Sequence, residues 1–186
     1  MRADLISTTA ALLMLAGAFW PFTLLADDKP LDLVESVDLQ RYQGLWYEIA
    51  RLPNEFQDQC AANVTAEYTL MDNGRVRVVN CCLLADGEVD GAEGVARRPD
   101  PNREAALKVR FAPRWLSWLP LVWGDYQIMA LSEDYSSVLI GAPSREYLWI
   151  LAREPSLPQE TVNALMAEAE RQGFDAGAVI RTRQDG

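Results

Sequence analysis

The feature that most limits the fold of this chain is a series of eight short β-type segments, separated by turn residues. The segments cover residues 45–52, 63–70, 75–82, 91–97, 105–112, 125–131, 137–142 and 147–153. Asp, Asn, Gly and Pro occupy the connections, which are short enough for each strand to pair with the next. The pattern therefore predicts an antiparallel sandwich or barrel of eight strands in a single domain.

Alternation of residue types shows which side of each strand faces the interior. In the fifth segment Leu107, Val109 and Phe111 share one face, whereas Lys108 and Arg110 share the other. The first of these faces points inward.

The connection at residues 72–74 sets the register of the second and third strands. A three-residue loop pairs Met71 with Arg75, and the apolar faces of the two strands then coincide. The opposed pairs are Val64 with Cys82, Ala66 with Asn80, and Tyr68 with Val78. A two-residue turn at Asn73 and Gly74 would mismatch these faces, so we predict the longer loop.

Helical periodicity occurs once, after the last strand. One apolar stripe identifies the helix: Val162, Leu165, Met166 and Ala169. Ser156 and Gln159 have the spacing of a capping box, Pro158 suits the first turn, and Gly173 ends the pattern. We expect this helix to pack on the wall of the β domain, and residues 178–182 to add a short ninth strand.

The N-terminus has the pattern of a secretory signal peptide, with Arg2 followed by a mostly apolar run over residues 5–26. We place cleavage after Ala26, a linker at residues 27–36 and the domain at residues 37–186. The alternative is a retained anchor, because about 20 apolar residues can span a bilayer. Either way we expect the domain to leave the cytoplasm. The apolar run contains no cysteine, so it lacks the lipobox needed for bacterial lipid attachment.

Charge and composition exclude several classes of function. The chain has 27 acidic and 17 basic residues and a formal net charge of -10, which disfavours nucleic acid as a partner. It has no histidine, so histidine-activated nucleophiles, histidine general bases and histidine metal ligands are unavailable. We therefore expect a protein without catalytic residues, bound metal or cofactor.

Three motifs resemble those of the lipocalin family. They are Gly44-Leu45-Trp46 after a short helical turn, Gly124-Asp125-Tyr126 in the sixth strand, and residues 147–153, which end in Arg153. The resemblance covers about residues 37–180 and is closest to the bacterial outer-membrane lipocalins of the Blc and apolipoprotein D type. It implies an eight-stranded up-and-down β-barrel with one closed end, one open end and an internal calyx for one apolar ligand.

The resemblance also implies structural roles for Gly44, Trp46, Asp125 and Arg153. Strand direction brings Trp46 and Arg153 together at the closed end, where the guanidinium can stack on the indole. Bacterial members usually carry a lipidated N-terminal cysteine, which this chain lacks. We therefore expect a periplasmic protein, with association with the outer membrane left open.

The ligand implied by the resemblance is a fatty acid or a lysophospholipid, stored or transported in the bacterial cell envelope. The inward residues expected to contact it are Val64, Ala66, Tyr68, Val78, Asn80, Leu107, Val109, Phe111, Tyr126, Ile128 and Trp149. Tyr126 and Trp149 are the best candidates to meet its polar part.

Two of the three cysteines lie near the open end by strand direction. Cys60 is in the long first loop and Cys82 ends the third strand, so we predict a disulfide between them. Cys81 faces the opposite side. It is either weakly buried against the helix or a free thiol.

The connection between the fifth and sixth strands is too apolar for an ordinary loop and contains Trp115, Trp118 and Trp123. Strand direction places it at the open end beside the first loop, where it would act as a ligand gate or touch a membrane surface. The alternatives are a loop that plugs the barrel or a dimer contact, so both a monomer and a homodimer remain open.

Two further expectations concern the interior and the function. Glu48 shares the face of Trp46, so inside the barrel it would need a partner, either water or an inward arginine such as Arg97. A polar spot on the cavity floor is one interpretation, and we favour the other, a solvated or hydrogen-bonded Glu48 with no role in ligand binding. Besides lipid binding, two function classes remain open: a lipocalin-fold enzyme acting on a lipid, and an envelope protein that docks through its tryptophan-rich loop.

Overall fold

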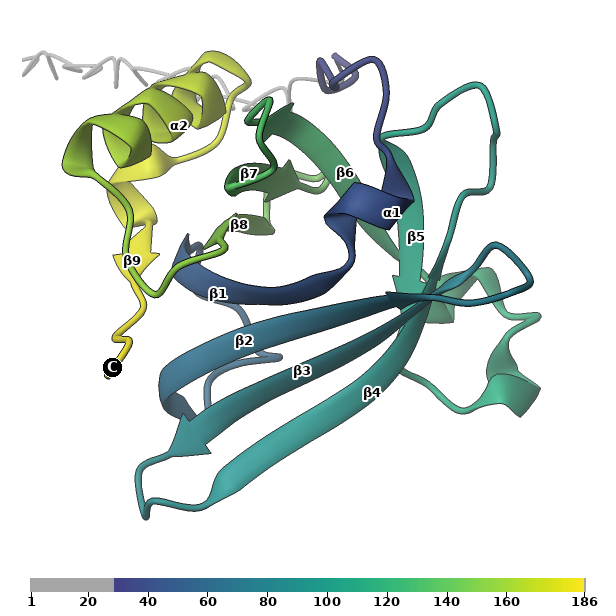
Figure 1. Ribbon diagram of the computed structural model, residues 1–186, viewed down its shortest axis with the longest axis horizontal. Coiled ribbons are helices and arrows are strands. Elements are labelled where there is room, and N and C mark those ends of the chain that lie inside the picture. Colours follow the sequence, from purple (N-terminus) through teal and green to yellow (C-terminus); the bar gives the residue numbers. More distant parts are fainter. Residues whose placement is uncertain (1–28, 186) are drawn as a thin grey trace, which may run out of the picture.

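The computed structural model describes residues 29–185, which form a β-barrel with a helix on its outer surface (Figure 1). The signal peptide expected at residues 1–26 lies outside the described residues. The barrel strands are β1 (Gly44–Arg51), β2 (Cys60–Leu70), β3 (Val76–Leu84), β4 (Val89–Arg97), β5 (Ala106–Arg110), β6 (Gly124–Leu131), β7 (Ser137–Gly141) and β8 (Leu148–Ala152). The largest departure from the predicted bounds is at the start of β2, which begins at Cys60 instead of residue 63.

The strands pair antiparallel in the order β2-β3-β4-β5-β6-β7-β8-β1, and β1 pairs back with β2 to close the barrel. The predicted eight-stranded up-and-down barrel is therefore confirmed. β1 pairs with β2 only from Gly44 to Tyr47. A ninth strand, β9 (Ile180–Arg181), continues along the same edge of β1 near Arg51, within the range predicted for it.

The register of β2 and β3 follows the predicted three-residue loop over most of its length. The amide of Met71 donates to the carbonyl oxygen of Arg75 over 2.8 Å. The pairs Tyr68 with Val78 and Ala66 with Asn80 are those predicted. The third pair, Val64 with Cys82, is wrong because the register shifts between Ala62 and Thr65, where Asn63 has a φ of 54°.

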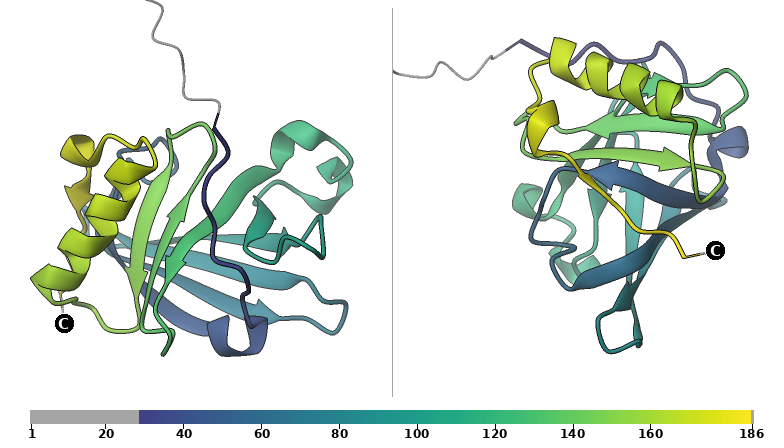
Figure 2. Two further views of the ribbon diagram at one scale, coloured as in Figure 1. Left: turned by 90° about the horizontal axis from the view of Figure 1, so that it is seen from above. Right: turned by 90° about the vertical axis from the view of Figure 1, so that its left-hand side faces the viewer.

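Helix α2 (Gln159–Arg171) lies on the outside of the barrel, over β1, β7 and β8 (Figure 2). The predicted apolar stripe faces the barrel, with Val162 and Ala169 buried and its other two members partly buried. The capping box is not formed. The helix begins directly after Pro158, so Ser156 lies outside the cap and no side chain caps the first turn.

Apolar side chains pack in two layers, one inside the barrel and one between its wall and α2. The neighbours Leu139 and Ile140 on β7 are both fully buried but belong to different layers, since successive strand residues face opposite sides. The strands under α2 are therefore covered on both faces.

The chain ahead of the barrel packs against it. Residues 27–36 were expected to form a linker, but from residue 29 they run along the wall towards the short helix α1 (Leu39–Tyr42) (Figure 2). Leu31 is buried with the layer under α2, and the amide of Val34 donates to the carbonyl oxygen of Ile128 over 3.1 Å.

Candidate functional site: the barrel interior and its two ends

Trp46 forms the floor of the barrel interior at the end covered by α1. Its side chain is fully buried, and its Nε1 donates a hydrogen bond to the backbone oxygen of Tyr42 over 2.9 Å. The guanidinium carbon of Arg153 lies 4.0 Å from the centroid of the indole. The stack expected at the closed end is present, and it contributes about 0.5 to 2 kcal/mol.

Arg153 also joins α1 to the strands. Its Nη1 donates to the backbone oxygen of Leu45 over 2.9 Å and its Nη2 to that of Arg41 over 2.8 Å. Gly44 has a φ of 94°, and a Cβ built on it would lie 3.3 Å from Nη1 of Arg153. Any other residue at position 44 would be strained and crowded, which explains why the first motif begins with glycine.

A cavity lies inside the barrel next to this floor, enclosed by apolar and phenolic side chains. Its lining residues are Leu39, Tyr42, Tyr68, Val76, Val78, Ala96, Leu107, Val109, Tyr126 and Ile128. Its volume is about 10 Å³, measured as the space open to the centre of a water molecule. That is room for about one water molecule.

Only part of the predicted ligand-contacting set lines this cavity. The residues present in both sets are Tyr68, Val78, Leu107, Val109, Tyr126 and Ile128. Val64 and Ala66 are buried but do not line this cavity, and Phe111 is 42% exposed. The prediction missed Val76 and Ala96, which strand alternation could have found, and also Leu39 and Tyr42, which come from α1 and carry no strand signal.

Three tyrosine hydroxyls meet at the cavity. The hydroxyl oxygen of Tyr126 lies 2.7 Å from that of Tyr42 and 2.8 Å from that of Tyr68. Burial raises the pKa of Tyr68 to about 12, and it raises the pKa of Tyr42 and of Tyr126 well above 10.0. All three phenols are therefore protonated at neutral pH and can donate hydrogen bonds.

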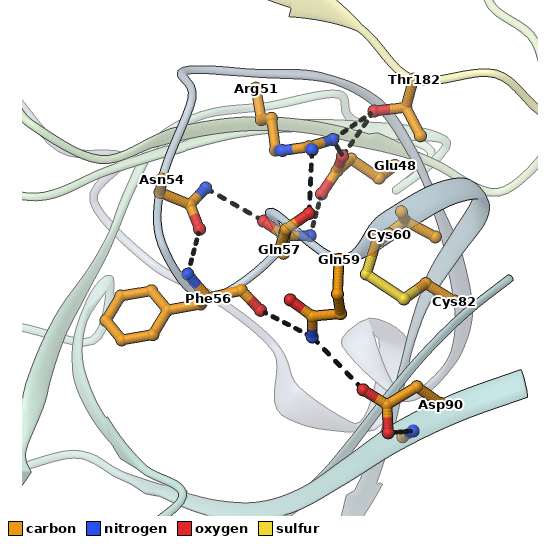
Figure 3. Close-up of a disulfide and its surroundings, with 12 residues drawn as sticks. Glu48, Arg51, Asn54, Phe56, Gln57, Gln59, Cys60, Cys82, Asp90 and Thr182 are labelled. Atoms are coloured by element: carbon orange, nitrogen blue, oxygen red, sulfur yellow. Dashed lines mark hydrogen bonds and ion pairs between the residues drawn. A yellow bond between two sulfur atoms is a disulfide. The ribbon is translucent and has the colours of Figure 1, made fainter. Parts of the chain in front are cut away.

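A second polar cluster lies beneath the first loop, residues 52–59 (Figure 3). The carboxylate of Glu48 pairs with Nη1 of Arg51 over 2.8 Å, and both side chains are buried. Gln57, from the loop, donates through Nε2 to Glu48 over 2.6 Å and accepts from Nε1 of Trp149 over 2.9 Å. The hydroxyl of Thr182 also donates to the Glu48 carboxylate.

Glu48 is hydrogen-bonded and buried, and its arginine partner is Arg51 and not Arg97, which was one of the possible partners. The register between β1 and β8 shifts between Glu48 and Ala50, so Arg51 faces the same side of β1 as Glu48 despite lying three positions along the chain. In a regular strand the two side chains would face opposite sides, so alternation could not have found the pair.

The predicted disulfide joins Cys60 to Cys82 beside this loop and is confirmed, with the two Cα atoms 5.6 Å apart (Figure 3). Cys81 is a free, partly exposed thiol. It pairs across to Gly91 of β4. Strands β3 and β4 lie on the side of the barrel away from α2 (Figure 1). Of the two alternatives for this cysteine, the free thiol applies and burial against the helix does not.

The tryptophan-rich connection between β5 and β6 stands out from the barrel on the side opposite to α2 (Figure 2). It contains two 3-10 turns, η1 (Arg114–Leu116) and η2 (Pro120–Val122). Trp115 and Trp118 are 74% and 75% exposed, and Leu121 is 96% exposed. These three side chains form an exposed apolar surface, which we call the loop surface.

Trp123 does not belong to the loop surface, contrary to its expected place at the mouth with the other two indoles. It is buried, with the guanidinium carbons of Arg97 and Arg110 4.1 Å and 5.2 Å from its ring centroid. These contacts hold the loop against the outer wall of the barrel. On the same wall, the motif residue Asp125 forms an ion pair with Lys108 over 2.7 Å. The loop supplies none of the residues that line the described cavity, so it does not plug it.

A family model described as a lipocalin-like domain matches residues 37–184. The chain belongs to the lipocalin family. This lipocalin is 38% identical to temperature-induced lipocalin-1 of Arabidopsis thaliana over 162 residues, 86% of each chain. It is 35% identical to outer membrane lipoprotein Blc of Escherichia coli K12 over 179 residues, 93% of this chain and 97% of that protein. Apolipoprotein D of Rattus norvegicus is 35% identical over 138 residues, 70% of this chain and 68% of that protein.

Solved structures agree with this lipocalin in fold. The cockroach allergen Per a 4 superposes with a TM-score of 0.64 at 16% identity, covering 84% of this chain and 94% of that one. Apocrustacyanin C2 superposes with a TM-score of 0.63 at 18% identity, covering 80% and 81%. Within residues 29–185, no helix is long and apolar enough to cross a membrane.

Proposed function

We propose that this lipocalin binds one fatty acid or lysophospholipid in its calyx and stores or transports it in a bacterial cell envelope. The main support is the cavity in the barrel, which apolar side chains and three phenol hydroxyls enclose. Apolar walls favour an acyl chain by about 0.8 kcal/mol for each methylene group buried. The phenols and the indole of Trp149 are polar partners available to the rest of the ligand.

Binding a ligand of this size requires the barrel interior to widen, because the cavity of about 10 Å³ is far smaller than an acyl chain. The first loop is the segment best placed to move. Gln57 attaches it to the wall through its contacts with Glu48 and Trp149, at 2.6 Å and 2.9 Å. We expect an incoming lipid to displace Gln57 from Trp149 while the floor at Trp46 stays in place.

We further propose a periplasmic location with peripheral contact to a membrane through the loop surface. Indoles favour the headgroup region of a bilayer, and Trp115 and Trp118 are largely exposed. The net charge of -10 gives no attraction to anionic lipids, so apolar insertion must supply the binding. The relative Blc is named an outer membrane lipoprotein, which is consistent with this location.

The loop surface also supports a second candidate function, the docking of a partner protein or of a second copy of the chain, which leaves both a monomer and a homodimer open. For either candidate we propose binding without catalysis. The phenols at the cavity have raised pKa values, so none is suited to act as a base at neutral pH.

The test compares the same substitution on the two faces of one strand. Val109 lines the cavity, and Lys108 faces outward beside it. Val109→Gln places an amide without partners in the calyx, so we expect at least about tenfold weaker binding of a fluorescent fatty acid by a folded protein. Lys108→Gln should bind like the unmodified chain. Equal binding by the two folded variants would argue against the calyx.

A further inference from the structure

The three tyrosines at the cavity, Tyr42, Tyr68 and Tyr126, hold one hydroxyl hydrogen more than they use among themselves. We call these hydroxyls the phenol trio. They make two hydrogen bonds, both through Tyr126. Each bond uses one hydrogen whichever oxygen donates, so two of the three hydrogens are engaged. Within residues 29–185 no other acceptor receives the third, and one O–H at the cavity is left without a partner.

The surroundings of the phenol trio determine which kind of acceptor fits there. The rest of the cavity lining is aliphatic and contains no charged side chain. The cation at this end of the barrel, Arg153, is stacked on Trp46 and bonded to backbone oxygens outside the lining set. An anionic head group would therefore be buried without a direct ion pair, at a desolvation cost, whereas a neutral oxygen needs only a donor.

The polar cluster beneath the first loop also holds one unpaired donor, the buried Nε of Arg51, but it belongs to a guanidinium that already pairs with the Glu48 carboxylate. The indole N–H of Trp149 already bonds to Gln57 over 2.9 Å. Gln57 in turn donates to Glu48, whose carboxylate is paired with Arg51. A ligand oxygen bound at the Trp149 indole must first break an existing bond, while one at the phenol trio gains a bond to a hydroxyl hydrogen that no described residue accepts.

We infer that the phenol trio is a binding site for one neutral acceptor oxygen at the end of an aliphatic chain. The ligand class is a long-chain ketone, aldehyde, alcohol or protonated fatty acid, held with its oxygen at the floor and its chain towards the mouth. This rests on the calyx function proposed above and, of the two ligands named there, selects the fatty acid in its protonated form, with its oxygen end deepest. Burial supports it, because a pKa of about 12 at Tyr68 keeps that phenol a donor at every physiological pH.

The experiment removes the hydroxyls but keeps the rings. In the triple variant Tyr42→Phe/Tyr68→Phe/Tyr126→Phe, all partners are lost together, so no orphan group destabilises the fold. The probes are 2-tridecanone labelled with 13C at the carbonyl and tridecane, which has the same chain length without the oxygen. We expect 2-tridecanone to bind the triple variant about 2- to 12-fold more weakly, with the affinity for tridecane unchanged.

The matched control is the double variant Tyr42→Phe/Tyr68→Phe, which differs from the triple variant only in the hydroxyl of Tyr126. That hydroxyl then has a free hydrogen, so the double variant should retain the preference for the ketone. The infrared carbonyl band of bound 2-tridecanone should lie at lower wavenumber in the unmodified chain and the double variant than in the triple variant.

Equal affinity for the ketone and the same carbonyl band in the double and triple variants would overturn the inference, while calyx binding would still stand. Failure of the unmodified chain to bind either probe while it binds the fluorescent fatty acid would also overturn the inference, whereas failure to bind all three would refute the calyx function. If the triple variant does not fold, the unmodified chain decides alone: a bound carbonyl band at the wavenumber found in hexane overturns the inference, and a band shifted to lower wavenumber supports it.

Discussion

Replacing Trp46 with alanine removes the floor of the barrel and should be among the most destabilising single changes in the chain. The indole is fully buried, and truncating a buried aromatic residue to alanine costs about 3 to 5 kcal/mol. We expect the upper part of this range. The change also removes the hydrogen bond to Tyr42 and the stack with Arg153, each a stabilising contact of about 1 kcal/mol.

The measurement is urea-induced unfolding followed by far-ultraviolet circular dichroism, which does not depend on the fluorescence of the indole that is removed. In a domain of this size each kcal/mol corresponds to about 2 to 4 °C, so a loss of about 4 to 5 kcal/mol should lower the melting temperature by roughly 8 to 20 °C. Trp118→Ala is the matched control. Its indole is 75% exposed, and its loss should change stability by no more than about 0.5 kcal/mol.

A double-mutant cycle separates the stack from the cavity left by the indole. The cycle consists of Trp46→Ala, Arg153→Met and the double variant. Arg153→Met removes the bonds to backbone oxygens whether or not the indole is present, so their contribution cancels. The remaining coupling energy, from the stack, should be about 0.5 to 2 kcal/mol. If the Trp46→Ala protein unfolds like the unmodified chain, Trp46 does not stabilise the closed end of the barrel. A coupling energy of zero would refute the stack as a stabilising contact.

Three other outcomes are expected. Replacing Cys60 and Cys82 with serine should lower stability by about 3 kcal/mol in urea unfolding, whereas replacing the free cysteine should not. Replacing Trp115 and Trp118 with serine should weaken binding to zwitterionic vesicles in a flotation assay, with little dependence on salt and no change in the melting temperature; unchanged flotation would favour docking to a protein. Because the pKa of Tyr68 is raised from 10.0 to about 12, its contribution to stability should be complete below pH 10 and be lost as the pH rises through 12, and the triple phenylalanine variant should lack this loss in urea titrations.

The strands could be predicted because their signals are local. Alternation and turn residues gave eight segments that the structure confirms, and the loop after Met71 fixed most of the register between β2 and β3. The errors occur where the backbone departs from regular alternation. One such place is near Asn63, and the other is the bulge that turns Arg51 towards Glu48. Both depend on pairing with strands distant in sequence, which a local pattern does not contain.

The candidate site was harder to predict than the fold because it is assembled from distant elements. Alternation correctly turned Tyr68 and Tyr126 inward, but the third member of the phenol trio comes from α1. Tyr42 is 84 residues from Tyr126, and Tyr68 is 58 residues from it. Trp123 was misplaced for a related reason. Two arginines on the outer faces of β4 and β5 bury it against the wall, and hydrophobicity alone does not reveal such a contact.

The two ends of the barrel are held by different kinds of contact, and this difference bears on how a ligand could be admitted. At the floor a fully buried indole packs beneath a guanidinium, and the ladder between β1 and β2 is intact as far as Tyr47. Beyond that residue β1 and β2 no longer pair directly, and the C-terminal segment joins them. β9 pairs with β1, the amide of Asn63 donates to the backbone oxygen of Arg183 over 2.8 Å, and the side chain of Gln184 donates to the backbone oxygens of Glu48 and Val64 over 2.8 Å and 2.9 Å. Release of this short segment would separate the two strands, whereas the floor opens only if its buried aromatic packing is lost. The half of the barrel under the first loop is therefore the half that can widen, while the half with the phenol trio keeps its geometry.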